Sequence, residues 1–234
     1  MVAFCDILGF SNLVGRRRLE DLVAHDLAIF RRILHYSLSH NWVAEPPSFD
    51  ELHSDARVDF AWFSDSIFLY SRDDSDESVR RLVETVSWLL FATITGTQTR
   101  VRGAISYGDV FIDSDNDLFV GQPIVEAARL EATQEWAGAA LTPAAVERVP
   151  ISRRDGHDPA WPLRPYLVPA KHSPAGIQTL AVDWTWGIHE LSWSCRWSDE
   201  NDAPPPEAWT ATPDLCTKFT NTRQFHDTGH CCSR

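Results

Sequence analysis

A short apolar run that holds a single acid constrains this chain most. The run extends from Val2 to Leu8, contains only Asp6 as a charged residue, and is followed by Gly9, which is typical of a buried strand that ends in a turn. Because Asp6 lies among β-branched and aromatic neighbours, we expect its carboxylate to be partly desolvated, which costs free energy unless a cation or donor compensates it. The run therefore predicts a central strand with an acid near its end.

A second acid is expected at the tip of a β-hairpin. Two β-prone runs, Val58 to Phe63 and Ile67 to Tyr70, flank the tripeptide that contains Asp65. If neighbouring strands bring Asp6 and Asp65 together, the two carboxylates form an oxygen-ligand site suited to Mg²⁺ or Mn²⁺. On the residues alone, the alternative that both acids are ordinary turn or capping residues stays open.

The remaining periodicities predict an α+β sandwich, with a mostly antiparallel sheet and helices packed on one face. Apolar residues recur at helical spacing from Leu19 to Leu38. The other expected elements are a helix over Asp76 to Ala92 after a Ser/Asp capping cluster, a strand over Arg100 to Ile112 interrupted by Gly103 and Gly108, a helix over Pro123 to Trp136, a strand over Ala139 to Thr142, a short helix opened by Pro143 and a last strand over Ile177 to Trp184.

The composition changes in the C-terminal part of the chain. We expect a catalytic domain over residues 1–184 and a Trp- and Pro-rich appendage over residues 185–234, whose tail is mobile and whose role the sequence does not reveal. The prolines from Pro159 to Pro174 are expected to break up the chain before the last strand. A zinc site in the tail is the weaker interpretation, because the adjacent Cys231 and Cys232 lack the C-x₂-C spacing of structural sites.

Charge and hydropathy exclude several classes of protein. The formal net charge of −12 argues against a protein that binds nucleic-acid backbone and favours one that acts on small molecules or contacts other proteins. No apolar run approaches the roughly 20 residues of a membrane span, and the N-terminus does not have the pattern of a signal peptide. The five cysteines are odd in number and lack the even, regular spacing of a disulfide framework, so we expect reduced thiols and a cytoplasmic protein.

Three motifs in succession resemble the class III nucleotidyl cyclase family. Residues 4–11, Phe-Cys-Asp-Ile-Leu-Gly-Phe-Ser, are similar to the family's strand with its first metal aspartate. Ser64-Asp65 takes the place of the family's Gly-Asp at the hairpin tip. Residues 102–108 and 121–131 resemble the strand and helix that end in Ala-Ala-Arg-Leu-Glu, here with Arg129 as the arginine. The resemblance covers residues 2 to about 142.

The resemblance implies a homodimer that closes a nucleoside triphosphate into a 3′,5′-cyclic monophosphate. Asp6, Asp65 and the backbone carbonyl of Ile7 would hold two divalent cations, Mn²⁺ or Mg²⁺. One cation lowers the pKa of the ribose 3′-OH, and the other neutralises the triphosphate and the leaving pyrophosphate. Arg129 would reach the α-phosphate from the other protomer and stabilise the transition state. The nucleotide-binding residues implied are Leu8, Gly9, Phe10, Ser11 and Ser64.

Departures from the family pattern concern the base and the sugar. The lysine and aspartate with which the family's adenylate cyclases read adenine are Ala61 and Leu118 here, and the ribose-orienting asparagine is Val125. A base pocket of Ala61, Phe63 and Leu118, narrowed by the aromatic residues of the hairpin strand, is expected to favour a one-ring base. With Ser64-Asp65-Ser66 at the hairpin, the chain looks most like the pyrimidine cyclases of Pycsar antiphage systems. That likeness implies UTP or CTP as the substrate, of which we favour UTP, and an effector that senses the cyclic product.

Two kinds of alternative function remain: a cyclase with another substrate, and a protein without catalytic activity. The chain could be a cytidylate cyclase, or an adenylate or guanylate cyclase with atypical base contacts. It could also be a catalytically silent module of cyclase fold that binds a nucleotide or a partner, which Val125 makes conceivable because valine cannot hydrogen-bond a sugar.

Overall fold

The computed structural model describes residues 1–40, 45–55, 58–97, 99–150, 154 and 161–186. All of them belong to one compact unit, Met1–Cys195. Apart from Thr185 and Trp186, the predicted appendage and its weaker zinc alternative lie outside the described residues.

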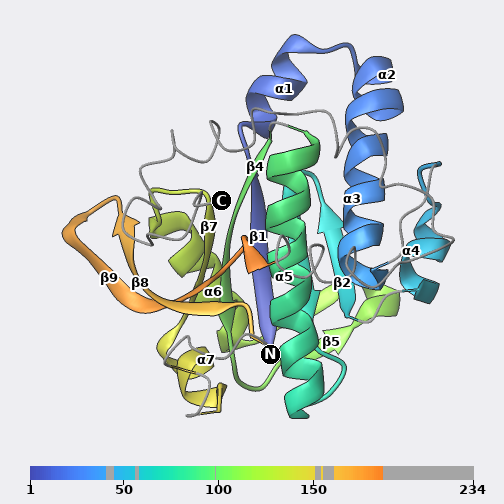
Figure 1. The fold of residues 1–234 in the computed structure, drawn as a ribbon. Helices are drawn as coiled ribbons and strands as arrows, with labels where there is room; N and C mark the ends of the chain where they lie inside the picture. Colours follow the sequence, from blue (N-terminus) through green and yellow to red (C-terminus); the bar gives the residue numbers. More distant parts are fainter. Residues whose placement is uncertain (41–44, 56–57, 98, 151–153, 155–160, 187–234) are drawn as a thin grey trace, which may run out of the picture. The chain divides into compact units, whose positions relative to one another are not determined.

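A seven-stranded sheet in the order β2-β3-β1-β4-β7-β9-β8 forms the centre of this unit (Figure 1). Among the described strands only β4 and β7 pair in parallel, so the predicted mostly antiparallel sheet is confirmed, with β1 inside it. A separate two-stranded ribbon is formed by β5 and β6. The strands are β1 (Val2–Leu8), β2 (Asp59–Phe63), β3 (Ser66–Tyr70), β4 (Arg100–Ser106), β5 (Phe111–Asp113), β6 (Leu118–Val120), β7 (Gly138–Leu141), β8 (Leu163–Ala170) and β9 (Ser173–Val182).

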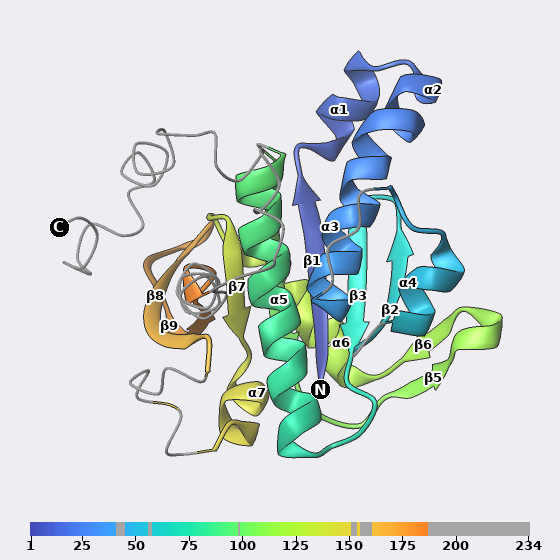
Figure 2. The same ribbon diagram turned by 45° about the vertical axis from the view of Figure 1, so that its right-hand side comes forward.

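The helices α3 and α5 lie side by side along one face of the sheet (Figures 1 and 2). From the other side α6 packs against β1 and β4, and it is the helix that carries Arg129. None of the described helices combines the length and apolarity that a membrane span requires. The helices are α1 (Phe10–Arg16), α2 (Leu19–Asp21), the π-helix η1 (Leu22–Asp26), α3 (Leu27–Ser39), α4 (Phe49–Asp55), α5 (Asp76–Gly96), the 3₁₀-helix η2 (Ser114–Asn116), α6 (Gln122–Thr133) and α7 (Pro143–Arg148).

The helix α5 confirms the expected pattern most closely. Ser75 caps it, since its hydroxyl accepts a hydrogen bond from the Ser78 N–H at 3.1 Å. Its apolar positions are buried against the sheet and α3, so this face supplies a large part of the core. They are Val79, Leu82, Val83, Val86, Leu89 and Leu90.

The predicted helix over residues 19–38 contains a π-helical segment. Beyond that segment Phe30 and Leu34 are buried as expected, whereas Leu19 and Val23, before and within it, are 69% and 48% exposed. A π turn holds one residue more than an α turn and therefore rotates the apolar face away from the core. The prediction of one continuous buried face was wrong for this reason.

Two strand predictions need correction. The strand expected over Arg100 to Ile112 is continuous through Gly103 but ends at Ser106, because the chain leaves the sheet at Gly108, whose φ of 146° favours glycine. The strand β8 was not predicted, because Pro165 and Pro169 favour breaks in the chain. Since β8 is the edge of the sheet and forms its ladder with β9, with an isolated bridge from Ala170 to Gln134 on its other side, its prolines do not interrupt a second ladder.

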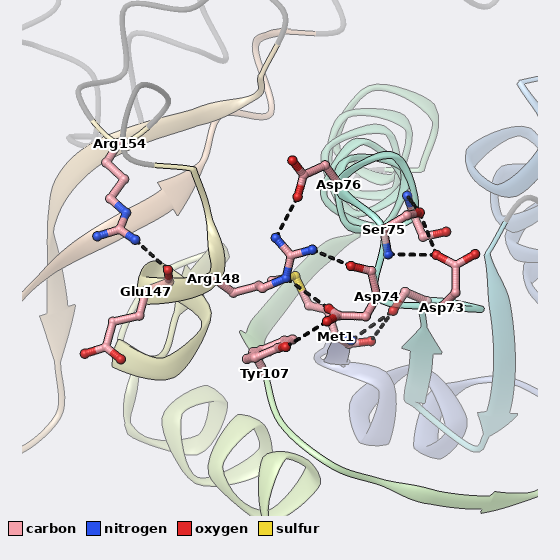
Figure 3. Close-up of polar contacts among 11 residues, drawn as sticks. Met1, Asp73, Asp74, Ser75, Asp76, Tyr107, Glu147, Arg148 and Arg154 are labelled. Atoms are coloured by element: carbon pink, nitrogen blue, oxygen red, sulfur yellow. Dashed lines mark hydrogen bonds and ion pairs between the residues drawn. The ribbon is translucent and has the colours of Figure 1, made fainter.

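An ion network joins the end of α7 to the start of α5 (Figure 3). The Arg148 guanidinium donates to a carboxylate oxygen of Asp74 at 2.9 Å and of Asp76 at 2.8 Å, and also to the Asp74 carbonyl. The Tyr107 hydroxyl donates to Asp74 at 3.1 Å, and the Arg148 guanidinium lies 5.7 Å from the centre of the Tyr107 ring. The network holds together segments more than 70 residues apart in the chain.

Candidate active site

Asp6 lies near the carboxyl end of β1, in the interior of the sheet. Its Cα partners are Ser66 on β3 and Arg102 on β4. Side chains directly opposite each other on antiparallel strands lie on the same face, so the Asp6 carboxylate shares a face with Ser66 and Arg102. The alternate residues of β1, Cys5 and Ile7, are buried on the other face, while Asp6 remains half-buried.

Asp65 is held against this end of β1 by the hairpin tip. The Ile7 N–H donates to the Asp65 carbonyl oxygen at 2.9 Å, which ties the tip to β1. Ser64 adopts a left-handed conformation with φ 55°, and its carbonyl accepts a hydrogen bond from the Trp62 indole N–H at 2.9 Å. The two acids that the sequence singled out therefore lie at one end of adjacent strands.

The carboxylate of Asp6 has positive neighbours that do not offset its burial and its acidic neighbours. Burial raises the pKa of the Asp6 carboxyl, and the neighbouring carboxylates of Glu131 and Asp65 raise it further. Arg102 and Lys171 act in the opposite direction without cancelling the effect. A cation bound between Asp6 and Asp65 would relieve this repulsion.

The donor set fits Mg²⁺ or Mn²⁺ only in part. Among the described residues no group of three or more His, Cys, Asp or Glu side chains could hold a metal ion. Mg²⁺ is commonly bound through one or two carboxylates plus substrate phosphates, rather than by an all-protein cage. Asp6 and Asp65 therefore fit a cation that arrives with a polyphosphate.

The sequence patterns did not predict an ion pair that is buried beside Asp6. Arg102 pairs with Glu131 of α6, and both side chains are largely buried, at 15% and 7% exposure. Arg102 also donates to the Gln134 carbonyl at 3.3 Å. Both residues stood in the recognised motifs, but their contact depends on the strand register and on helix packing, which no local pattern encodes.

Arg129 lies on the exposed face of α6, and no hydrogen bond or ion pair joins it to another described residue. An arginine at this position of a helix could have formed a surface pair with Glu126 or Glu131. Glu126 instead accepts from Ser106 at 3.2 Å, and Glu131 pairs with Arg102. Val125 is one turn before Arg129 and is 42% exposed, so these two residues share a face of α6.

The segment after β1 places the predicted phosphate-binding residues at the start of α1. Gly9 has φ 82° and occupies the N-cap position, where no side chain caps the helix. The first N–H groups of α1 therefore have no capping side chain. Leu8 ends β1, Ser11 is exposed and Phe10 is half-buried.

The predicted base-pocket residues are not enclosed within one chain. Phe63 is 82% exposed and Leu118 is 47% exposed, while Ala61 is half-buried. Phe60 and Trp62 point to the opposite face of β2 because strand side chains alternate. There they pack on residues of α4, with Phe60 stacked on His53 at 4.3 Å, so they cannot narrow a pocket on the Ala61 face, contrary to expectation.

No protein-family model matches the sequence, and no curated protein matches it. The fold is similar to the catalytic core of a rhodopsin-guanylyl cyclase with converted specificity in complex with ATPαS, with TM-score 0.54 and 16% identity over 77% of this chain and 93% of that one. It is also similar to the guanylyl cyclase domain of the RhoGC fusion protein from the aquatic fungus Blastocladiella emersonii. A monomeric double mutant of that domain gives TM-score 0.53 and 16% identity, and a non-canonical dimeric form gives 0.51 and 14%. These two matches cover 77% of this chain and 92% and 91% of the other chains. The chain therefore has the fold of the class III nucleotidyl cyclase domains.

Proposed function

We propose that this protein is a nucleotidyl cyclase that converts a pyrimidine nucleoside triphosphate, preferentially UTP, into its 3′,5′-cyclic monophosphate and pyrophosphate. The observation that carries the proposal is the placement of two acids and one arginine. Asp6 and Asp65 lie at one end of adjacent strands, and Arg129 is exposed on a helix beside the same sheet, without a partner among the described residues.

Asp6, Asp65 and the carbonyl of Ile7 would hold two divalent cations, with the substrate phosphates as further ligands. The bound cations would acidify the ribose 3′-OH and neutralise the leaving pyrophosphate. The uncapped N–H groups after Gly9, together with Ser11 and the segment at Ser64, would hold the triphosphate.

Arg129 would act on the α-phosphate bound by a second protomer. Arg129 is exposed and makes no hydrogen bond or ion pair with another described residue, so its guanidinium is available to another chain. Exposed apolar side chains on β2, the β5–β6 ribbon and α6 support a homodimer, since such side chains are typical of interaction surfaces. They are Phe63, Phe111, Leu118, Val120 and Val125, between 42% and 82% exposed.

The pyrimidine preference rests on Ala61 and Leu118, which replace both adenine-reading side chains of the family. Of the aromatic residues on β2, only Phe63 faces the same side as Ala61, so steric exclusion of a two-ring base depends on Phe63 and the partner protomer. A product sensed by an effector in antiphage defence is the role that the sequence resemblance suggests.

The purified protein should be incubated with ATP, GTP, UTP or CTP and Mn²⁺, and any cyclic product identified by mass. Cyclic UMP as the main product supports the proposal. Cyclic CMP as the main product would keep the pyrimidine assignment but make CTP the preferred substrate. A kcat/KM for ATP or GTP equal to or above those for UTP and CTP would make the chain a purine cyclase. If the protein binds a nucleotide in the presence of Mn²⁺ but forms no cyclic product from any of the four, it is a catalytically silent binding module.

A further inference from the structure

A cavity of about 310 Å³ lies on the helical side of the hairpin tip, away from the face that carries Asp6. It is lined by side chains from five elements: Phe10 of α1, Val23 of η1, Leu27 and Arg31 of α3, Phe49 of α4 and Trp62 of β2. Its volume is at the lower end of the range for small-molecule sites. No sequence pattern had suggested it, because its residues come from distant segments.

The lining is apolar apart from Arg31 and Ser64, and Arg31 is its one cation. Phe49 and Trp62 pack at 6.2 Å between ring centres, and the Trp62 indole N–H is already bonded to the Ser64 carbonyl, so Trp62 offers only its ring. Arg31 makes no hydrogen bond or ion pair with any other residue that the structure describes. An arginine beside aromatic rings binds a carboxylate through paired N–H donors, while the rings favour an aromatic body.

The helix that forms one wall has an uncommon geometry at this place. Val23 lies in the π-helical segment, and this turn leaves Val23 48% exposed rather than buried in the core. Val23, Leu27 and Arg31 follow at four-residue steps, which places them along one face of the helix. Single π turns inside longer helices are frequently found at functional sites.

We propose that this cavity is a second ligand site, distinct from the nucleotide site, for a small aromatic carboxylate whose ring packs between Phe49 and Trp62 and whose carboxylate pairs with Arg31. The ligand would adjoin the predicted nucleotide site, because the cavity lining includes Phe10 and Ser64, which the family resemblance also assigns to nucleotide binding. It would nevertheless occupy the other face of β2 from Ala61 and Phe63.

The test uses the full chain without nucleotide or metal and therefore does not depend on turnover. Ligand-observed NMR titration measures the Kd of 3-phenylpropanoate and of its neutral analogue 3-phenylpropanamide. We expect the acid to bind at least about tenfold more tightly than the amide, and Arg31→Gln to remove that difference. The matched control is Arg18→Gln, which removes one positive charge from a side chain that is 82% exposed and outside the cavity.

A second variant separates loss of the site from loss of the fold. Val23→Trp fills the cavity from an exposed position and should abolish binding of both probes while the circular dichroism spectrum and Tm stay unchanged. Equal Kd values for acid and amide, binding of the acid that survives Arg31→Gln, or absence of binding at millimolar probe would overturn the proposal. Competitive displacement of the acid by Mn²⁺–UTP would also overturn it, because the cavity would then belong to the nucleotide site.

Discussion

Replacing Arg148 by methionine removes the cation that joins α7 to the start of α5 (Figure 3). The Arg148 side chain is only 16% exposed, whereas its partners Asp74 and Asp76 are 66% and 69% exposed. Methionine keeps an unbranched apolar stem, so the substitution removes the hydrogen bonds and the charge with little loss of packing.

The expected cost follows from the exposure of each partner. An ion pair with an exposed carboxylate contributes at most about 1 kcal/mol, so the pairs with Asp74 and Asp76 together contribute on the order of 1 kcal/mol. The bond from the shielded guanidinium to the Asp74 carbonyl adds about 1 kcal/mol more. A total of about 2 kcal/mol corresponds to a Tm lower by about 4–8 °C for a domain of this size.

The measurement is thermal unfolding followed by circular dichroism at pH 7, with Arg72→Met as the matched control. Arg72 also forms a two-pronged pair, with Asp59 at 3.0–3.2 Å, but its side chain is 51% exposed. Because solvent screens this pair, Arg72→Met should lower the free energy of unfolding by only about 0.5 kcal/mol, which corresponds to a Tm lower by about 1–2 °C. If Arg148→Met lowers Tm no more than Arg72→Met does, the reasoning from exposure is wrong.

The remaining predictions concern pH and catalysis. Arg148 lowers the pKa of the Asp74 carboxyl by hydrogen bonding. The stability that this pair contributes is therefore fully present above the pKa of Asp74 in the unfolded chain, and it is lost as the pH falls through the pKa of Asp74 in the folded protein. The Tm difference between wild type and Arg148→Met should therefore shrink below about pH 4, and a constant difference down to pH 2 would contradict this. Asp65→Asn should lower turnover by about 10²-fold or more without unfolding the protein, and near-normal product formation with Mn²⁺ would remove Asp65 from the metal site. Mixing inactive Asp65→Asn with inactive Arg129→Ala should restore one site per heterodimer. No recovery, with heterodimers shown to form, would mean that each site lies within one chain.

The elements that could be predicted from the sequence are those with a strong local pattern. The apolar run with its acid predicted β1, two β-prone runs around a polar tripeptide predicted the hairpin, and helical spacing after a capping serine predicted α5. The missed elements depend on neighbours in space. The prolines of β8 are compatible with a strand only because β8 is at an edge, and the exposure of Val23 depends on a π turn.

For the candidate site, the sequence by itself determined which residue types are available: Asp6 after an apolar strand, Asp65 at a hairpin tip and Arg129 on a helix. Only the tertiary structure decided their surroundings. Strand register places Arg102 opposite Asp6, and the packing of α6 pairs Arg102 with Glu131 and leaves Arg129 without a partner in the part of the chain that the structure describes. Helix and strand propensities are properties of a few consecutive residues, whereas register and packing are set by the burial of whole faces against distant segments. Packing of distant segments also brings Arg31, Phe49 and Trp62 to the lining of one cavity.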